Sequence, residues 1–466
     1  MYESKLIEQI CKLNKTEKHY FLKWTKSPIA NARQDVIQLT EFILSKRSIT
    51  AQTMDKQQAF KYVYPKKRFS IQELRYLMNY TLTCLDAFLA YYYWKNYTQL
   101  EPLHLIAQQQ KLNVSTIPNT IKKTHQAYNN KTIQDSQQSL LHYFLANENY
   151  AYLSKNSRHE AFDFERISNS LHHFAIAEVL RNACLAFSVE QVGGNKALFP
   201  LLEVCISLYK SKMYADVPSI EIYGLLYSAL TKNDDDDFKK LFTIIFEDQH
   251  LFSDKEWKDI ILLCINYCIK NLNVSKKGFA LYAYQLYQLG LNKKYLLENN
   301  ELSRFTFKNI VFIGTKHLKN YKEVIEFIKK YQHYLHPKYQ KQTVIFNTAI
   351  VYFAQKKYNE TLQLLQQTEF DDVLWNLNAK NILMMIFYEK NEDEVLLSFL
   401  KSYKIYLYRQ KSIGYHLQRY KKVVDYCFKM NKIKNEQKKR AELLIEISND
   451  NQLPERDWFI EQLKPK

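Results

Sequence analysis

Residues 345–365 read IFNTAIVYFAQKKYNETLQLL, and this stretch determines the fold that we expect. Apolar side chains recur from Ile345 to Phe353 at spacings of three and four, which places them on one face of a helix. Polar residues 355–357 interrupt the pattern, and a second apolar face of the same period begins at Tyr358. The stretch therefore predicts two helices joined by a short turn.

The same two-helix pattern occurs on both sides of this stretch. Leu383 follows Ala349 by 34 residues, and Phe312 precedes it by 37 residues, each at the corresponding point of a first helix. Repeats of this length are typical of stacked helix hairpins, because one hairpin alone cannot bury its apolar face. Weaker helix pairs continue upstream, at residues 222–230 with 238–246 and at residues 260–269 with 279–289.

These segments resemble tetratricopeptide repeats, most clearly over residues 303–410. Ala349 occupies the small position of that family's first helix and Tyr352 the aromatic position. Tyr358 is the tyrosine that opens the second helix, and Leu365 takes a later apolar position. Phe312 and Leu383 stand at the small position of the neighbouring repeats, where larger side chains are expected to push the two helices apart. The resemblance implies an all-α protein, a right-handed α-solenoid of antiparallel helix pairs, whose usual work is to bind a peptide or another protein.

The low glycine content limits the chemistry that the chain can perform. Only 7 of 466 residues are glycine and only 9 are proline. Phosphate-binding loops and dinucleotide fingerprints need backbone conformations that glycine adopts most readily. The composition therefore favours helices joined by short polar turns over such enzyme architectures.

The seven cysteines indicate a reducing compartment. They are odd in number, scattered, and mostly placed within apolar helical stretches, which is typical of buried thiols rather than of a disulfide framework. The N-terminal residues contain no continuous apolar segment of a signal peptide, and no apolar stretch is long enough to span a bilayer. We therefore expect a cytoplasmic protein that makes no membrane contact.

The first part of the chain is expected to differ from the rest. Residues 1–130 contain several short helices and one long helix from Ile71, for which Ser70 and Glu73 have the spacing of a capping box. The polar stretch 112–135 is the expected boundary. The sequence thus predicts an N-terminal helical region over 1–130 and a tetratricopeptide-like solenoid over 131–466.

No group of residues has the spacing of a catalytic or metal site. Cys264 and Cys268 are one helical turn apart, but structural zinc normally requires a second pair, so both are expected in the core. Asp234 to Asp237 are expected to begin a helix rather than bind a cation, because carboxylates stabilise helix N-termini. We expect neither an enzyme nor a cofactor. A pocket that brought together the titratable side chains of the 159–172 region would reverse this expectation; they are His159, Asp163, Glu165 and His172.

The chain carries a net charge of +18, which raises the alternative of a nucleic-acid partner. Only twelve of the 66 basic residues are arginine, whereas nucleic-acid readers favour arginine, so most of the excess is attributed to compositional drift. Residues 401–440 are the exception, because thirteen basic residues there meet only Asp425 and Glu436 and are interleaved with tyrosines. Such a face could neutralise phosphates and stack on bases, or it could be a solvated outer face whose tyrosines pack between helices.

The leading hypothesis is a non-catalytic scaffold that binds a peptide or protein on the solenoid surface. The expected partner contacts are side chains of first helices that point away from the second helix of the pair. They are Asn347, Lys380 and Asn381. The alternative is a nucleic-acid-associated protein that uses the basic, tyrosine-rich 401–440 face. Its candidate residues are Lys404, Arg409, Arg419, Lys421, Lys422, Lys438, Lys439 and Arg440.

Overall fold

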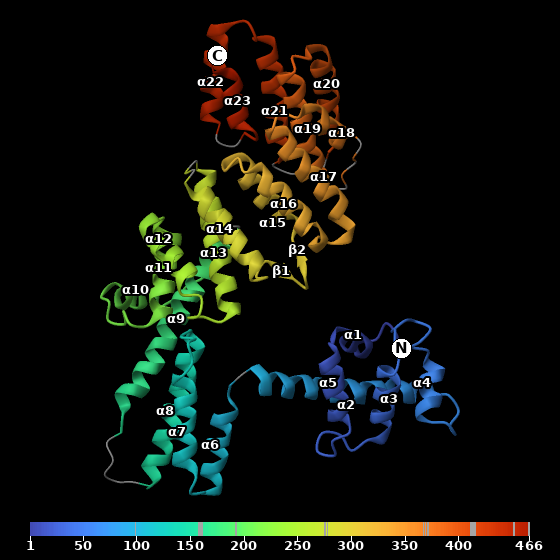
Figure 1. Ribbon diagram of the computed structural model, residues 1–466, viewed down its shortest axis with the longest axis vertical. Helices are drawn as coiled ribbons and strands as arrows, with labels where there is room; N and C mark the ends of the chain where they lie inside the picture. The colour runs from blue at the N-terminus through green and yellow to red at the C-terminus, as the bar shows by residue number, and fades with distance from the viewer. Residues whose placement is uncertain are drawn as a thin grey trace. The chain divides into compact units, whose positions relative to one another are not determined.

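The computed structural model describes residues 1–97, 99–156, 162–191, 193–274, 276, 278–366, 368, 370, 372–410, 416–450 and 453–464. Nearly all ordered segments of this part are helices (Figure 1). The strands found there are one short antiparallel pair, β1 (Leu297–Glu298) and β2 (Glu301–Leu302). The expectation of an all-α protein is therefore confirmed.

The chain forms two compact units. Unit 1 comprises Met1–Lys131 and Gln137–His172, and unit 2 comprises Thr132–Ser136 and His173–Lys466. Residues 137–172 belong to unit 1, whereas the sequence had placed them in the solenoid. The reason is local packing, since Leu141 and Leu145 share a core with Ile106 and Ile121 of the preceding helices.

Unit 1 is built around the long helix that the sequence predicts. Its helices are α1 (Lys5–Lys12), α2 (Lys15–Thr25), α3 (Gln34–Leu44), α4 (Lys56–Val63), α5 (Ile71–Tyr97), α6 (Glu101–Leu112), α7 (Ile117–Asn129), α8 (Ser136–Asn156) and the first part of α9 (Phe164–Gln191). The Ser70 hydroxyl accepts a hydrogen bond from Glu73 N at 3.2 Å and caps α5, as expected. Helices α1 to α4 all pack on α5, and Phe21, Phe60 and Phe88 fill the space between them.

Unit 2 contains the second part of α9, from His173, and a series of helices most of which pack on a neighbour in the sequence. They are α10 (Leu202–Lys210), α11 (Pro218–Lys232), α12 (Asp235–Glu247), α13 (Asp254–Asn273), α14 (Phe279–Asn292), α15 (Arg304–Phe312), the π-helix η1 (Ile313–His317), α16 (Tyr321–Tyr331), the 3-10 helix η2 (Gln332–Tyr334), α17 (Pro337–Ala354), α18 (Tyr358–Gln366), α19 (Val373–Glu389), α20 (Asp393–Arg409), α21 (His416–Lys432), α22 (Gln437–Asn449) and α23 (Arg456–Leu463). The helices predicted from residue 303 to residue 410 are all present. Each pairs with its successor, as α17 does with α18 and α19 with α20, and α15, α17, α19 and α21 also contact one another in turn.

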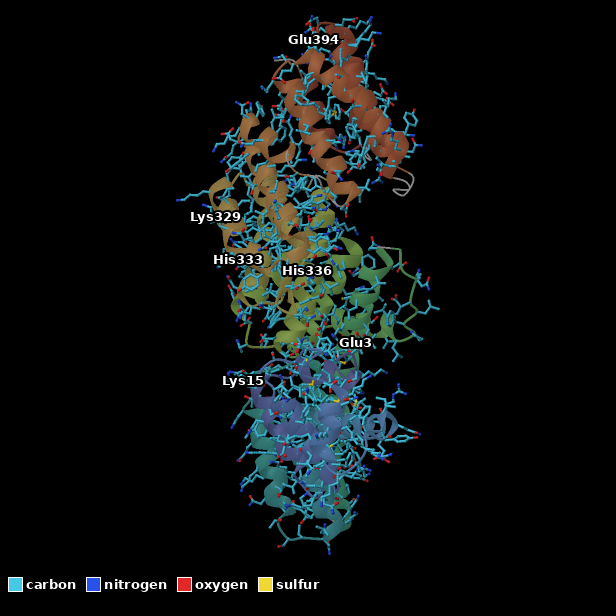
Figure 2. All side chains as sticks on the ribbon, turned by 90° about the vertical axis from the view of Figure 1, so that its right-hand side faces the viewer. Glu3, Lys15, Lys329, His333, His336 and Glu394 are labelled. Atoms are coloured by element: carbon cyan, nitrogen blue, oxygen red, sulfur yellow. The ribbon has the colours of Figure 1, made fainter. Side chains whose placement is uncertain are left out.

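Side chains of the sequence fix where these helices begin. Asp372 accepts hydrogen bonds from the backbone N–H groups of Leu374 and Trp375 and caps α19, and Asp234 caps α12 in the same way, as expected. His336 Nδ1 accepts from Lys338 N at 3.2 Å and caps α17. Figure 2 shows His336 with His333 and Lys329 at the surface, where α16 passes through η2 into α17.

The π-helix η1 changes the register of the first clear repeat. Phe312 was expected at the small position that faces the second helix, but it is 37% exposed. Gly314 makes the close approach instead, since a Cβ built on it would lie 2.5 Å from Val324 Cγ2 of α16. A π-turn inserts an extra residue into the helix, so the side chains on either side of it rotate relative to α16.

Within the described residues, none of the helices is both long enough and apolar enough to cross a bilayer.

Candidate functional site

Two neighbouring cavities of unit 2 lie on the first helices of successive pairs. The first, of about 340 Å³, is lined by α13, α15 and η1, and the second, of about 320 Å³, by α15, η1, α17 and α19. Residues of the segment 453–461 line both cavities, and Phe312, Lys316, Glu455 and Asp457 are common to the two. We call the surface of α13, α15, η1, α17 and α19 that lines these cavities the central groove, which the segment 453–461 divides into two parts.

The groove has a repeated origin in the sequence. The first helices α15 (continued by η1), α17 and α19 each contribute side chains at positions i, i+4 and i+7 that line the second cavity. The three sets are Lys308, Phe312 and Thr315; Phe346, Ile350 and Phe353; and Asn378, Ile382 and Met385. This stripe was not recognised in the sequence, although its spacing was present there, because the repeats were aligned on the residues that pack the two helices of a pair together.

Lysine side chains surround the apolar floor of the groove. Lys308, Lys316 and Lys319 line the second cavity beside Phe346 and Ile382. Burial lowers the pKa of Lys308, and the carboxylates of Glu455 and Asp372 oppose that effect. Its ammonium lies 5.8 Å from the ring centroid of Phe346. The site thus offers cations beside apolar surface, a combination that suits a carboxylate next to an apolar side chain.

The N-terminus of α23 already places such groups in the groove. Asp457 pairs with Lys316 at 3.2 Å, and Glu455 precedes the helix in a left-handed conformation with φ 56°. Burial raises the pKa of Glu455, whereas the ammonium groups of Lys316 and Lys308 oppose that rise. The carboxylates of Asp457 and Glu455 therefore interact electrostatically with lysines of the groove.

Aromatic contacts hold the rest of α23 in place. Trp458 Nε1 donates to Glu389 Oε1 at 2.6 Å, and its ring lies 5.5 Å from that of Tyr388. Phe459 is completely buried, and Arg440 donates to the carbonyl oxygen of Gln462 at 2.7 Å near the end of the helix. The helix is thus anchored on α19 and α22 while its first residues extend into the groove.

Two of the expected partner contacts are not on a surface. Asn347 and Asn381 are both completely buried, which corrects their placement on an exposed face. Asn347 donates to the carbonyl oxygen of Thr343 at 2.8 Å, and Asn381 accepts from the Tyr403 hydroxyl at 2.9 Å. The helix face that carries them packs against neighbouring helices, so these amides serve the core.

Lys380 also lies elsewhere than expected. Its ammonium lies 4.8 Å from the ring centroid of Tyr406 and 5.9 Å from that of Phe399, both on α20. Burial lowers the pKa of this lysine. The side chain therefore points toward the second helix of its pair, and the prediction that it points away is wrong.

Folding supplies carboxylates to the basic 401–440 face. Five of its lysines form ion pairs. Three of the partners come from outside the stretch, in the pairs Lys422–Asp450, Lys429–Glu446 and Lys434–Asp393. The other two pairs, Lys404–Asp425 and Lys439–Glu436, lie within it. Arg440 donates to backbone carbonyls, and the Lys421 ammonium lies 4.7 Å from the Tyr408 ring centroid. Arg409 and Lys438 are exposed, Arg419 is half-buried, and Lys411 lies outside the described residues. The face is less positive than its sequence indicates.

The tyrosines of this face pack between helices. Tyr403, Tyr420 and Tyr426 are buried and Tyr406 is half-buried, whereas Tyr408 is 64% exposed. Tyr415 lies outside the described residues. The described tyrosines therefore do not form a row of exposed rings that could stack on bases. This geometry favours the alternative in which the tyrosines pack between helices.

The possible catalytic cluster does not assemble among the described residues. Asp163 caps α9 by accepting from Arg166 N at 2.9 Å, while Glu165 and His172 are exposed. His159 lies outside the described residues. Asp163 does line a small cavity of about 110 Å³ in unit 1 with His125 and Arg166, but Glu165 and His172 are not among its lining residues.

Six of the seven cysteines are buried, as the sequence predicts for most of them, and Cys11 is exposed. Cys264 and Cys268 are completely buried, and burial raises the pKa of both thiols, so neither is activated as a nucleophile or ligand. In the part of the chain that the structure describes, no three histidine, cysteine or acidic side chains are grouped to hold a metal ion.

Comparison with known proteins adds no relative to this picture: no protein-family model matches the chain, and neither does any curated protein or solved structure.

Proposed function

We propose that this chain is a non-catalytic interaction scaffold that binds a segment of another protein in the central groove. The observation that carries the proposal is the repeated stripe that α15 with η1, α17 and α19 direct into one groove. Apolar grooves lined by cations and several helices are suited to an extended or helical peptide, which buries apolar side chains on the floor and pairs its charges at the edge.

The finer architecture belongs to the same proposal. We propose that the helix pairs from α11 onward are tetratricopeptide-like and stack as a right-handed α-solenoid, with first helices lining the inner surface. Two features support this: the contacts among α15, α17, α19 and α21, and the pairing of α11, α13, α17 and α19 with the helix that follows each of them. Stacked pairs of this kind generate an extended concave surface.

Photo-crosslinking tests the groove directly. A benzophenone amino acid replaces Phe312, which is 37% exposed in the groove, or Val395, which is 47% exposed on α20 and is not among the cavity-lining residues. We expect a discrete protein adduct from position 312 and none from position 395 in cells that express the full chain.

A charge variant makes this experiment specific. Lys316→Glu reverses a groove charge and is expected to abolish the adduct, whereas Lys432→Glu, an exposed residue of the basic 401–440 face, is expected to leave it unchanged. Two results contradict the proposal that the groove binds protein. One is equal adduct formation from positions 312 and 395, and the other is loss of the adduct with Lys432→Glu alone.

A further inference from the structure

We propose that the segment 453–461 is an internal occupant of the central groove, and that the partner segment which displaces it has the same chemistry, an acidic residue followed by an aromatic residue in a short helix. This inference rests on the proposed function, because it names the kind of partner that the groove accepts.

The two cavities are parts of one groove. They share Phe312 and Lys316 on the groove side and Glu455 and Asp457 on the side of the segment. The segment is thus the divider between them, and its displacement joins the two spaces into one continuous surface along α13, α15, α17 and α19. About 340 Å³ and 320 Å³ remain open beside it, so the groove has room for further side chains of a partner.

The contacts of the segment define what the groove recognises. A carboxylate, Asp457, pairs with Lys316, and the next side chain, Trp458, uses its indole N–H on Glu389 and its ring on Tyr388. Lys308 and Lys319 also line this part of the groove, so an acidic partner gains further charge complementarity there. The same surface disfavours a basic segment.

The part of the segment inside the groove is weakly held. Glu455 adopts a left-handed conformation without being glycine, which is a strained arrangement for a side chain with a Cβ. The Lys316–Asp457 pair is exposed, with 39% and 69% of the two side chains accessible, and pairs of this kind contribute little stability. The anchor lies instead in the buried side chains of Leu453, Trp458, Phe459 and Leu463, and a competing segment has to replace these contacts.

A peptide of the segment itself is the probe. A fluorescein-labelled peptide of residues 453–464 (LPERDWFIEQLK) is titrated with the full chain and followed by fluorescence anisotropy. The wild-type chain is expected to bind weakly, because the attached segment competes at a high effective concentration. The full chain with Trp458→Ala loses the anchor of its own segment and is expected to bind the wild-type peptide at least about ten-fold more tightly.

Charge exchange tests the acidic preference. The peptide with Asp457→Lys is expected to lose its affinity for the Trp458→Ala chain, and Lys316→Glu in that chain is expected to restore binding of the altered peptide. The matched control is Ile445→Ala, a 64% exposed position on α22, which is expected to leave binding as in the wild type. If Trp458→Ala does not fold, as circular dichroism would show, the exposed Asp457→Lys chain replaces it.

Three results overturn the inference. The first is equal peptide binding by the folded wild-type chain and the folded Trp458→Ala chain, and the second is no peptide binding by either chain. The third is peptide binding that neither charge change alters. The crosslinking experiment at position 312 distinguishes a failure of this inference from a failure of the proposed function. If the crosslinks persist while the peptide neither binds nor competes, the groove binds protein but the segment is not its occupant, and if they are absent too, both proposals fail.

Discussion

Left-handed residues end several of the helices, and few of them are glycine. Lys319, Lys356 and Asn391 have φ of 55°, 60° and 56°, and each lies in the turn between the two helices of a pair. Glycine is the residue usually found at this position, because a Cβ disfavours it. A chain with 7 glycines therefore retains strain at its repeat turns.

Replacing Lys356 with glycine is expected to raise stability. Lys356→Gly removes the left-handed penalty and is expected to add about 0.5 to 1 kcal/mol to the free energy of unfolding, net of the entropy of glycine. Gln355→Gly, one residue earlier at an ordinary φ of −83°, is expected to reduce stability instead. Thermal unfolding of the two variants checks this, and a lower midpoint for Lys356→Gly contradicts it.

A buried carboxyl makes the stability of unit 2 depend on pH. Glu256 accepts a hydrogen bond from the Tyr223 hydroxyl at 2.7 Å. Burial raises the pKa of Glu256 to about 7, the nearby Asp135 and Glu178 add to the rise, and Arg181 opposes it. In the unfolded chain the same group has an ordinary pKa near 4.5.

The sign of the effect follows from these two pKa values. Below about pH 4.5 the Glu256 carboxyl is protonated in both the folded and the unfolded chain. Between about pH 4.5 and 7 only the unfolded chain releases the proton, so the contribution of Glu256 to stability declines as the pH rises. Above about pH 7 this contribution is lost. Glu256→Gln keeps an acceptor for Tyr223 but does not ionise. It is expected to be more stable than the wild type by about 2 to 3 kcal/mol at pH 8 and similar to it near pH 4. Urea unfolding across this range measures it, and exposed Glu247→Gln serves as the control.

At the scale of single elements, η1 determines how α15 meets α16. Gly314 lies where a Cβ would be 2.5 Å from Val324 Cγ2 and 3.2 Å from Tyr284 Cε2. Both neighbours are buried, so neither can move away without disturbing the core. The close approach of these helices thus depends on one glycine within the π-turn.

Gly314→Ala is expected to cost about 1 to 3 kcal/mol of unfolding free energy by overpacking. Val324→Ala removes the nearest contact, so the double variant is expected to be more stable than the sum of the two single effects. Gly278→Ala, where a Cβ has no neighbour within 4 Å, is the control and is expected to be neutral or slightly stabilising. Chemical denaturation of the four chains measures the coupling, and strictly additive effects contradict this packing.

At the scale of the whole molecule, the chain has separate cores in its two units. Leu39 lies in the core of α1 to α5 in unit 1, and Leu400 lies in that of α17 to α23 in unit 2; both are completely buried. Leu39→Ala and Leu400→Ala are each expected to cost about 2 to 5 kcal/mol. Calorimetry of the full chain is expected to resolve two transitions, of which each variant lowers one, and a single transition shifted equally by both variants contradicts this division.

The net charge is a property of the whole molecule as well. Because folding pairs many lysines of residues 401–440 with carboxylates, we expect binding to random single-stranded RNA at about 50 mM salt to vanish by about 200 mM. Fluorescence anisotropy measures this, with Lys421→Glu and Lys422→Glu together as the variant. Binding that persists at physiological salt and collapses in that variant favours the nucleic-acid alternative over the scaffold.

The helices and their pairing could be predicted from the sequence because their causes are local. The apolar period of residues 345–365, the break at residues 355–357 and the capping side chains all act within a few residues of one another, so they predict α17 and α18 without knowledge of the rest. The same holds for the buried Cys264 and Cys268, which follow from an apolar helical context.

The tertiary structure decided which polar residues face solvent and which charges are neutralised. Periodicity identifies an apolar face but not the neighbours that cover its edges, so Asn347 and Asn381 looked accessible although adjacent helices bury them. Asp450 and Asp393 reach the lysines of residues 401–440 only after the helices pack, because an ion pair depends on distance in space rather than along the chain. The groove and its divider have the same origin, since Lys316 and Asp457 are far apart in sequence and meet only where α23 returns to η1.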